Sequence, residues 1–489
     1  MAQPKPRRNY PKNPKNPKHP KRSSKHLTVA IHAADLKSLR EIVRTHPLDY
    51  GCRPHAIPDP MGSYYTTALV SKEELEQLRK KDLDIRYLFD QISEDRSAEA
   101  TIGKGDRFKG GHVPPQGTGS RLEGSDDDLG PILNADEIGS AIQGLVNEYG
   151  IPTFDVPNAT AEGSGGKGGM TGPINPNAYH VYFTAGVHAR ERGGPDNLIY
   201  FIADLLFAQK HSIGLTYGSK IYSKADVIKA LNTGIVFFPL VNPDGVRYDQ
   251  KTDSLWRKNR NPADATAGNE ATIGVDINRN YDFLWDFRRH FHPIAASSST
   301  LASDKPVDET YHGRHAFSEA ETRNVAWVFD QFPRVRWYMD IHSAAGDFLF
   351  NWGDDNDQFD DPSMQFLNPA WDGKRGIVGD TAYREWIEEM DFGKIVNASN
   401  RVVRAMQTVG GRSYRPLQAV GLYPTSGASD DYAFGRYRGN AKLNKVHGFT
   451  MEFGYPTNFY PTLPEYHASL KDTGAGLMEF CLAAADAGL

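Results

Sequence analysis

Cysteine is nearly absent from this 489-residue sequence, which contains only Cys52 and Cys481. Two distant cysteines cannot build a disulfide framework or a cysteine zinc cluster, so a bound metal has to be held by His, Asp or Glu. The sequence also lacks an apolar run of about 18 residues, which argues against a membrane span. No apolar run follows the basic N-terminus, so we expect no secretory signal. The compartment stays open between the cytoplasm and export by a non-standard route.

The N-terminal tail, residues 1–26, has no acidic residue and carries nine Lys or Arg, although the whole chain has a net charge of −5. Its frequent prolines and dense charge oppose a packed core, so we predict that it is disordered. It is either a solubilising tail or an arm that contacts an anionic surface. The remaining chain is acidic, which argues against nucleic acid as the main partner.

Residues 27–98 predict a small α+β module in which strand-like and helical patterns alternate. The spacing of Ser71 and Glu74 is that of a capping box at the start of its second helix. Residues 99–130 are rich in Gly, Ser and charge, which is typical of a linker with exposed protease sites.

Residues 131–489 read as an α/β domain with a mixed, mainly parallel central sheet flanked by helices. The last periodic stretch, 466–487, predicts a C-terminal helix interrupted by glycine. The predicted strands lie within HVYFTAGVH (180–188), TGIVFFPLVN (233–242), VRWYMDIHS (335–343) and KVHGFTMEFG (445–454).

Metal-binding and acid–base residues stand where three of these strands end. One strand runs into His188 and Glu191, another into His342, and a third into Glu452. Ligands of open α/β sheets bind outside the carboxyl ends of the strands, so we expect these side chains to meet. Two histidines, one carboxylate and an open position are typical of catalytic zinc, and Glu452 is a candidate general base. Each motif alone is weak, because a lone HxxE is more often a capped turn.

Seven ordered sequence blocks make the chain similar to the zinc metallocarboxypeptidases of the pancreatic carboxypeptidase A/B type. They cover about 270 residues, in the order in which that family has them. The blocks are HARE (188–191), VNPDG (241–245), WRKNR (256–260), GVDINRNY (274–281), DIHS (340–343), LYPTSGASDDYAF (422–434) and FTMEFG (449–454).

The resemblance implies a role for each matching residue. His188, Glu191 and His342 would bind Zn²⁺, and Glu452 would take a proton from the attacking water. Arg257 would stabilise the developing oxyanion, and a substrate carboxylate would be gripped by Asn278 and Arg279, since arginine matches a carboxylate bidentately. Tyr423 would close over the substrate, Arg190 would line the groove, and Asp430 would lie at the bottom of the side-chain pocket.

An acid at Asp430 favours substrates that end in Lys or Arg, and a mixed preference is the alternative. Ala344 and Ala345 stand where pancreatic members have a tyrosine of a more distant subsite. Two insertions, 285–315 and 351–376, are expected to enlarge the rim of the cleft. The second is rich in carboxylates, so it is a candidate Ca²⁺ site, and a solvated acidic loop is the alternative because no EF-hand pattern is present.

The resemblance implies a zinc-dependent exopeptidase that acts on the C-termini of peptides or proteins. It also suggests that residues 1–130 are an inhibitory pro-region, because the family is made with a small α+β pro-domain. Two other functions remain open: an amidohydrolase on peptidoglycan stem peptides or N-acyl amino acids, and a non-catalytic binding module. The complete set of three ligands and Glu452 argues against the binding module.

Overall fold

The computed structural model describes residues 27–46, 48–50, 56–58, 62–81, 83–90, 102–121, 129–173, 175–421, 423–454 and 458–489. The predicted tail and Cys52 lie outside these residues. In the part of the chain that is described, no helix combines the length and apolarity that crossing a membrane requires.

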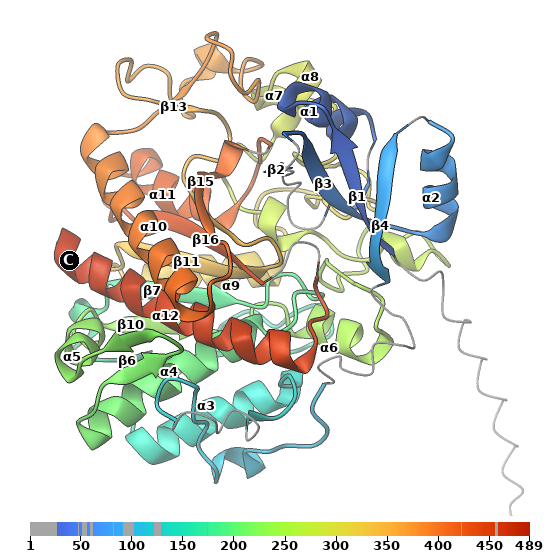
Figure 1. Ribbon diagram of the computed structural model, residues 1–489. Coiled ribbons are helices and arrows are strands. Elements are labelled where there is room, and N and C mark those ends of the chain that lie inside the picture. The colour runs from blue at the N-terminus through green and yellow to red at the C-terminus, as the bar shows by residue number, and fades with distance from the viewer. Residues whose placement is uncertain are drawn as a thin grey trace, which may run out of the picture.

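The N-terminal module is a four-stranded antiparallel sheet in the order β2-β3-β1-β4, with two helices. It stands beside the larger body as a separate unit (Figure 1). Its second helix begins at the predicted capping box, in which Ser71 and Glu74 cap each other. In chain order the elements are β1 Leu27–Ala33, α1 Leu36–Thr45, β2 Ile57–Pro58, β3 Tyr64–Val70, α2 Lys72–Arg79 and β4 Asp84–Asp90.

Residues 102–121, within the predicted linker, lie against the larger body. Phe108 and Thr118 are buried. The backbone N–H groups of Gly119 and Ser120 donate to the buried carboxylate of Asp204 at 2.8 and 2.9 Å. This stretch therefore contributes to the core of the larger body, although its composition is that of a linker.

The larger body contains an eight-stranded sheet in the order β15-β12-β16-β11-β7-β10-β6-β5. The four neighbouring strands β16, β11, β7 and β10 are mutually parallel, and antiparallel pairs flank them. The sheet is therefore mixed and mainly parallel, as predicted. Its strands are β5 Thr153–Asp155, β6 Lys167–Thr171, β7 Val181–Ala185, β10 Ile235–Phe238, β11 Trp337–Ser343, β12 Asp347–Phe350, β15 Arg415–Gln418 and β16 His447–Phe453.

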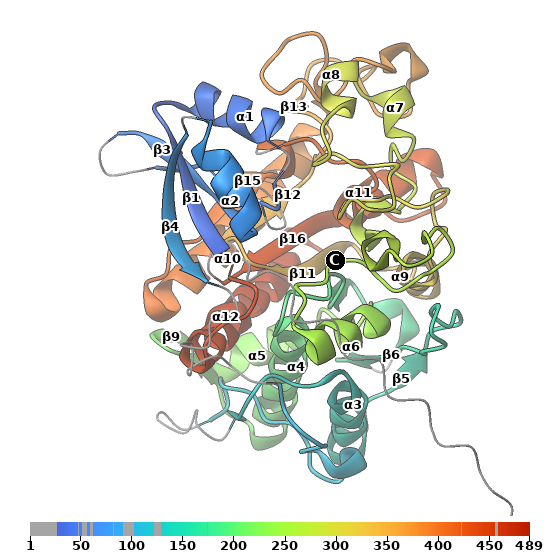
Figure 2. The same ribbon diagram turned by 90° about the vertical axis from the view of Figure 1, so that its right-hand side faces the viewer.

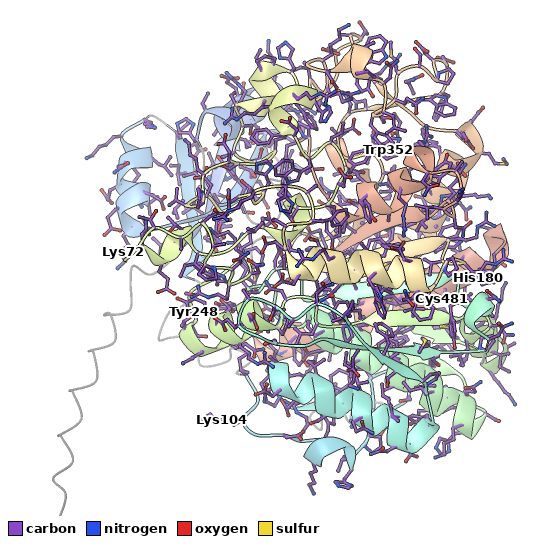
Figure 3. All side chains as sticks on the ribbon, turned by 180° about the vertical axis from the view of Figure 1, so that it is seen from behind. Lys72, Lys104, His180, Tyr248, Trp352 and Cys481 are labelled. Atoms are coloured by element: carbon purple, nitrogen blue, oxygen red, sulfur yellow. The ribbon has the colours of Figure 1, made fainter. Side chains whose placement is uncertain are left out.

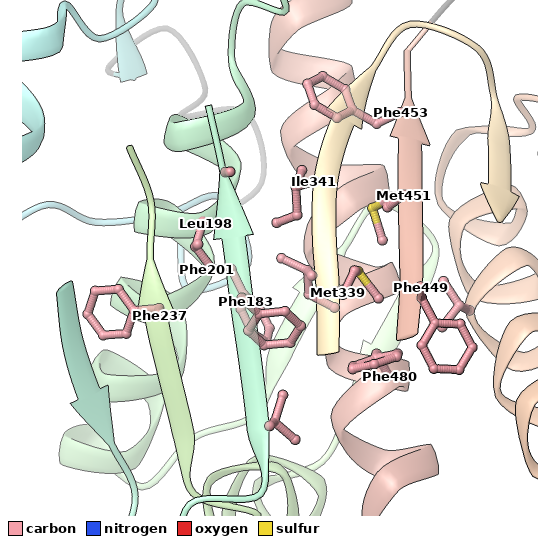
Figure 4. Packing of buried hydrophobic residues seen from close by; sticks show 14 of the residues in the cluster. Phe183, Leu198, Phe201, Phe237, Met339, Ile341, Phe449, Met451, Phe453 and Phe480 are labelled. Atoms are coloured by element: carbon pink, nitrogen blue, oxygen red, sulfur yellow. The ribbon is translucent and has the colours of Figure 1, made fainter. Parts of the chain in front are cut away.

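Helices cover both faces of this sheet. Side chains alternate along each strand, so Phe183 of β7 faces α4 and α12 while Tyr182 faces α9. Figure 4 shows Phe183 packed in the first of these layers with Met339, Phe449 and Phe480. The helices are α3 Ala135–Tyr149, α4 Gly194–His211, α5 Lys224–Leu231, α6 Pro243–Thr252, α9 Ala320–Gln331, α10 Glu389–Gly410, α11 Ser429–Gly439 and α12 Leu463–Ala487.

Helix α12 is continuous, although glycine predicted an interruption. Gly474 and Gly476 face neighbouring side chains at close range: a Cβ on Gly474 would strike the ring of Tyr217, and one on Gly476 would lie 2.9 Å from Met406 Cγ. The two glycines have no side chain where α12 packs closely on the body. This packing holds the helix together, so α12 continues through them.

The two insertions form the rim of the body above the carboxyl edge of the sheet, drawn in yellow and orange in Figures 1 and 2. Little of this rim is regular structure, so side-chain hydrogen bonds hold much of it. Its short elements are α7 Phe287–His290, α8 Pro293–Ala296, β13 Asp357–Gln358 and β14 Glu385–Trp386, and a two-stranded ribbon elsewhere consists of β8 Leu215–Tyr217 and β9 Lys220–Tyr222.

The N-terminal module contacts the body on this side of the sheet, and Figure 2 shows it beside β12 and β15. Asp49 receives hydrogen bonds from both terminal nitrogens of Arg190, whose side chain is 1% exposed. Leu69 of the module packs in a small apolar cluster with Leu255 and Phe459. Helix α1, the rim and the body around Tyr423 line an open cavity of about 590 Å³. The module thus covers part of the edge to which the site residues belong.

Candidate active site

Two adjacent parallel strands, β7 and β11, deliver the predicted metal ligands. His188 follows β7 by three residues, and Glu191 lies in the turn before α4. His342 is in β11, beside β7. All three side chains are at most 4% exposed. Because parallel strands end at one edge, ligands remote in sequence meet there, as predicted.

The ligand atoms converge on a single point. Glu191 Oε1 lies 2.7 Å from His188 Nδ1, and Glu191 Oε2 lies 2.9 Å from His342 Nδ1. The two Nδ1 atoms are 3.0 Å apart. One ligand atom from each residue lies within 4.8 Å of the other two. The carboxylate and both Nδ1 atoms therefore face the place where a metal ion would be held.

Two aspartates fix the opposite sides of the imidazole rings. Asp276 Oδ1 lies 2.9 Å from His188 Nε2, and Asp340 Oδ2 lies 2.9 Å from His342 Nε2. Such a contact holds the Nε2 proton on the ring and turns Nδ1 toward the place where a metal ion would be held. Two imidazoles and one carboxylate suit Zn²⁺, so the residues present fit this ion.

Sequence reasoning missed both aspartates as site residues. Asp276 stands inside GVDINRNY and Asp340 two residues before His342, so the signal was present within the quoted blocks. Asp340 is further held by Thr184 Oγ1 at 2.7 Å and Ser429 Oγ at 3.0 Å. These partners come from β7 and α11, and no pattern in the sequence predicts that they meet.

The charges of the site keep its carboxylates ionised. Burial alone would raise the pKa of Glu191, but His188 and His342 hold this pKa well below its usual range. Burial likewise opposes ionisation of Asp276, and Arg257 and His188 hold its pKa well below normal. Both groups are therefore anionic at neutral pH, as metal binding and histidine orientation require.

Glu452 lies beside His342 on the neighbouring strand. The two residues are Cα partners in the parallel pair β11–β16, and both are buried. Their side chains point to the same face, since Phe449, Met451 and Phe453 occupy the opposite one. Glu452 thus shares the face and the edge on which the metal ligands converge.

Arg257 lies within the metal-ligand group. Its Nη2 donates to Asp276 Oδ2 at 2.9 Å, and its Nη1 is 3.9 Å from Glu191 Oε1. The guanidinium is 2% exposed. A permanent positive charge therefore stands next to the point where the ligands converge.

The predicted carboxylate clamp lies against the first insertion. Arg279 donates from Nε to Leu301 O at 2.8 Å and from Nη2 to Thr300 O at 3.0 Å. Asn278 Oδ1 accepts a hydrogen bond from the backbone N–H of Ser429 at 2.8 Å. The insertion therefore fixes the orientation of Arg279, an arrangement that the spacing in NRN does not reveal.

Asp430 is buried at the start of α11, on the β16 side of the site. Its Oδ2 accepts a hydrogen bond from Thr450 Oγ1 at 2.9 Å. Thr450 precedes Glu452 by two residues, so it lies on the same face of β16.

Tyr423 is only 7% exposed and lines the cavity beneath α1, and Arg190 faces Asp49 of the module.

This arrangement is typical of metallohydrolases, in which three protein side chains hold the metal. Here the three side chains lie at the carboxyl edge of a mixed α/β sheet. The sequence matches the family model described as "Zinc carboxypeptidase" over residues 163–473. The chain therefore belongs to the zinc carboxypeptidase family, a family of metallopeptidases that hydrolyse peptides.

Known proteins agree with this assignment. The chain is 27% identical over 302 residues to "Carboxypeptidase B" of Astacus astacus, covering 61% of this chain and 76% of that protein. It is 28% identical over 277 residues to "Zinc carboxypeptidase A 1" of Drosophila melanogaster, covering 55% and 49%, so it spans about half of this second relative. The crystal structure of carboxypeptidase A from Helicoverpa armigera superimposes with a TM-score of 0.63 at 19% identity, covering 95% of this chain and 98% of that one. At that identity the likeness shows the fold alone, and it confirms the predicted fold class.

Proposed function

We propose that this chain removes single residues from peptide C-termini, with Glu452 as the general base. The observation that carries the proposal is the position of Glu452, the strand partner of His342 at the edge where three metal ligands converge. Bound Zn²⁺ would polarise the scissile carbonyl and lower the pKa of water. Glu452 would accept the proton of that water and pass it to the leaving amine.

Arg257 and the clamp are proposed to position the substrate. The guanidinium of Arg257 lies beside the ligand group, where negative charge develops on the carbonyl oxygen, so it would stabilise that charge. Arg279 is oriented by the backbone carbonyls of Leu301 and Thr300, and its Nη1 lies 3.9 Å from Asp276 Oδ2. The guanidinium fixed in this way would pair with the substrate carboxylate. A clamp for a free carboxylate favours an exopeptidase over an endopeptidase, and peptide C-termini are the proposed partners.

We propose a preference for C-terminal Lys or Arg on the strength of Asp430. Its carboxylate is buried on the face of β16 that also carries Glu452, where a cationic side chain would pair with it. Mixed specificity is the competing outcome. The alternative function is an amidohydrolase that acts on stem peptides or N-acyl amino acids. It would use the same residues on a different acyl group.

The N-terminal module is proposed to be an inhibitory pro-region. Asp49 accepts hydrogen bonds from Arg190, a residue proposed to line the groove. Helix α1 lies over the cavity that Tyr423 lines. A substrate would have to compete with both contacts. The chain that tests this should begin at residue 102, because residues 102–121 pack on the body and their removal would expose Asp204.

Hydrolysis of paired blocked dipeptides tests the proposal. One pair ends in Arg or Phe as the free acid, and the other carries the same residues as C-terminal amides. Full-length protein and the chain from residue 102 are compared with and without a zinc chelator, and the Glu452→Gln variant is the control. Chelator-sensitive release from acids alone supports the exopeptidase, and a higher rate for Arg supports the role of Asp430. A zinc-loaded protein that cleaves N-acyl amino acids but no dipeptide would favour the amidohydrolase.

A further inference from the structure

The cavity beneath α1 lies between parts of the chain that are far apart in sequence. Its volume of about 590 Å³ is within the range of pockets that hold small ligands. Helix α1 and β3 of the module form one wall. The opposite wall comes from both insertions, from β15 and from the segment around Tyr423. We call this space the module–rim cavity.

The module side of the cavity is formed largely by one face of α1. Leu36, Arg40 and Arg44 line the cavity and follow one another at four-residue spacing, so they share a face of the helix. Ile42 packs instead on the core of the module. Leu36 is 38% exposed, although it is aliphatic. Helix α1 therefore presents apolar surface to the cavity in addition to the surface that it buries in the module.

The body side of the cavity is also apolar. Ile294 of α8 is 52% exposed and lines the cavity together with Ile377 and Leu417. Two exposed aliphatic side chains, Leu36 and Ile294, thus border the same space from the module and from the body. A ligand with an apolar chain would remove both from water, which is favourable.

The charges around the cavity are all of one sign. Every charged side chain among the described residues that line it is an arginine: Arg40, Arg44 and Arg415. Arg44 pairs with Glu41, and Arg415 pairs with Asp347. Arg40 is exposed, and within the described ranges it forms no hydrogen bond or ion pair. A positive charge therefore stands available where the apolar cavity meets solvent.

We propose that the module–rim cavity binds one amphipathic carboxylate of the fatty-acid type. Its chain would lie between Leu36 and Ile294, and its carboxylate would pair with Arg40, whose planar fork matches a carboxylate. A neutral apolar ligand would not use the arginines, and a small anion would leave the apolar walls in water. The cavity is bounded by two walls and has the volume of a small-ligand pocket, so it suits a single molecule and not a lipid surface.

Such a ligand would hold the module and the body together. It would contact both walls, in addition to the existing pair between Asp49 and Arg190. By mass action, a ligand that binds only the docked arrangement favours that arrangement. This step rests on the proposed inhibitory role of the module: the ligand would keep the groove covered and slow peptide hydrolysis.

Calorimetric titration of the full-length protein with fatty acids tests the proposal. We expect one saturable site per chain. Kd should tighten about fourfold for each CH₂ from octanoate through decanoate to dodecanoate, because each added CH₂ is buried. Decanol, which lacks the carboxylate, should bind roughly tenfold more weakly than decanoate, because it loses the attraction of three arginines. Acetate, which lacks the chain, should show no saturable binding.

Variants on both walls test whether the ligand bridges them. Arg40→Gln, in the module, should weaken decanoate binding about threefold. Ile294→Asn, at an exposed position of the body, should weaken it roughly tenfold. Arg79→Gln in α2 and Ile221→Asn in β9 are the matched controls, since both side chains are exposed and neither lines the cavity. Figure 3 shows α2, which begins at Lys72, on the side of the module away from the body.

Three results would overturn the proposal: no saturable binding of decanoate, binding of decanol as tight as that of decanoate, or wild-type affinity in either cavity variant. An apolar peptide amide that binds more tightly than decanoate, and that loses affinity in Ile294→Asn, would assign the cavity to a peptide instead.

Peptide hydrolysis by the same full-length proteins is measured separately. Decanoate should slow the wild type, and Arg40→Gln should need about threefold more decanoate for the same inhibition. Equal inhibition of both proteins would place the acid at the zinc-type centre and contradict the effect on docking. A protein that binds decanoate in this cavity but cleaves no peptide would support the cavity site and contradict the proposed function alone.

Discussion

At the scale of single residues, the histidine pair depends on the two aspartates behind it. Asp276→Asn or Asp340→Asn would leave an amide where a carboxylate fixes the ring and raises its basicity. We expect zinc affinity to fall about 10- to 100-fold for each variant. Competition with a chromogenic chelator measures this directly, and Asp155→Asn, an exposed acid, is the control. Wild-type zinc affinity in both variants would show that the contacts are only structural.

Glu452→Gln separates chemistry from metal binding. The amide keeps the size of the side chain but cannot accept the proton of the attacking water, so kcat should fall about 100- to 10,000-fold. Zinc content should remain at one per chain, because Glu452 is not among the converging ligands. Metal analysis beside steady-state kinetics checks both points. A variant that keeps more than a tenth of the wild-type kcat would exclude Glu452 as the base.

The convergence of the three candidate metal ligands could be predicted from the sequence because these residues sit in compact blocks at strand ends. His188, Glu191 and His342 converge as expected. The supporting contacts could not be predicted in the same way. Asp340 acts on His342 within one strand, but Thr184 and Ser429 reach it from β7 and α11, and such partners depend on register and packing. The acids of the second insertion were visible in the sequence, but their burial was not.

At the scale of single elements, α12 depends on the absence of side chains at its contact face. In an exposed helix, alanine in place of glycine stabilises by about 0.5–1 kcal/mol. Gly474→Ala should instead lower the free energy of unfolding by ~1–3 kcal/mol, since the new methyl group would overlap the Tyr217 ring. Gly393→Ala in α10, which has no neighbour within 4 Å, is the matched control and should stabilise. Denaturant unfolding compares the two, and equal effects would contradict the packing argument.

The strands and helices themselves were predictable from periodicity, and the exceptions have one cause. Glycine and linker-like composition predicted a break in 466–487 and an exposed connector over 99–130. In both places glycines lie where a side chain would collide: Gly474 against Tyr217, and Gly117 against Asp204. A glycine-rich composition indicates a flexible backbone. At these two positions, however, glycine is needed because another element lies too close to leave room for a side chain.

At the scale of the whole molecule, we propose that the contact between module and body limits access to the groove. Asp49→Ala would leave the buried Arg190 without this carboxylate and weaken the docking. We expect the full-length variant to hydrolyse peptides roughly tenfold faster, because Asp49 is partly exposed and the pair is correspondingly moderate. Glu76→Ala, on the exposed side of α2, should change nothing. The chain from residue 102 provides the upper limit of activity, and a full-length wild type already at that limit would contradict inhibition by the module.

Buried acids near the second insertion should make the stability of the molecule depend on pH. The pKa values of Asp355 and Glu385 rise from 3.8 and 4.5 to about 7 in the folded chain. Protonation therefore stabilises the fold fully below about pH 4, and this stabilisation is lost as the pH rises through 7. Tm should therefore fall between pH 5 and pH 8. Thermal denaturation across this pH range measures the decline, and a Tm that does not change with pH would contradict it.

The convergence of ligands from β7 and β11, with Glu452 from β16, also makes metal retention a test of correct refolding. His188 and His342 are 154 residues apart, and they meet only when the central strands pair in register. A slip of one residue in β11 would turn His342 toward α12, although the helix content would hardly change. A preparation with native circular dichroism can therefore still contain misregistered molecules. Zinc stoichiometry would reveal them, and it is the more stringent criterion for samples recovered from inclusion bodies.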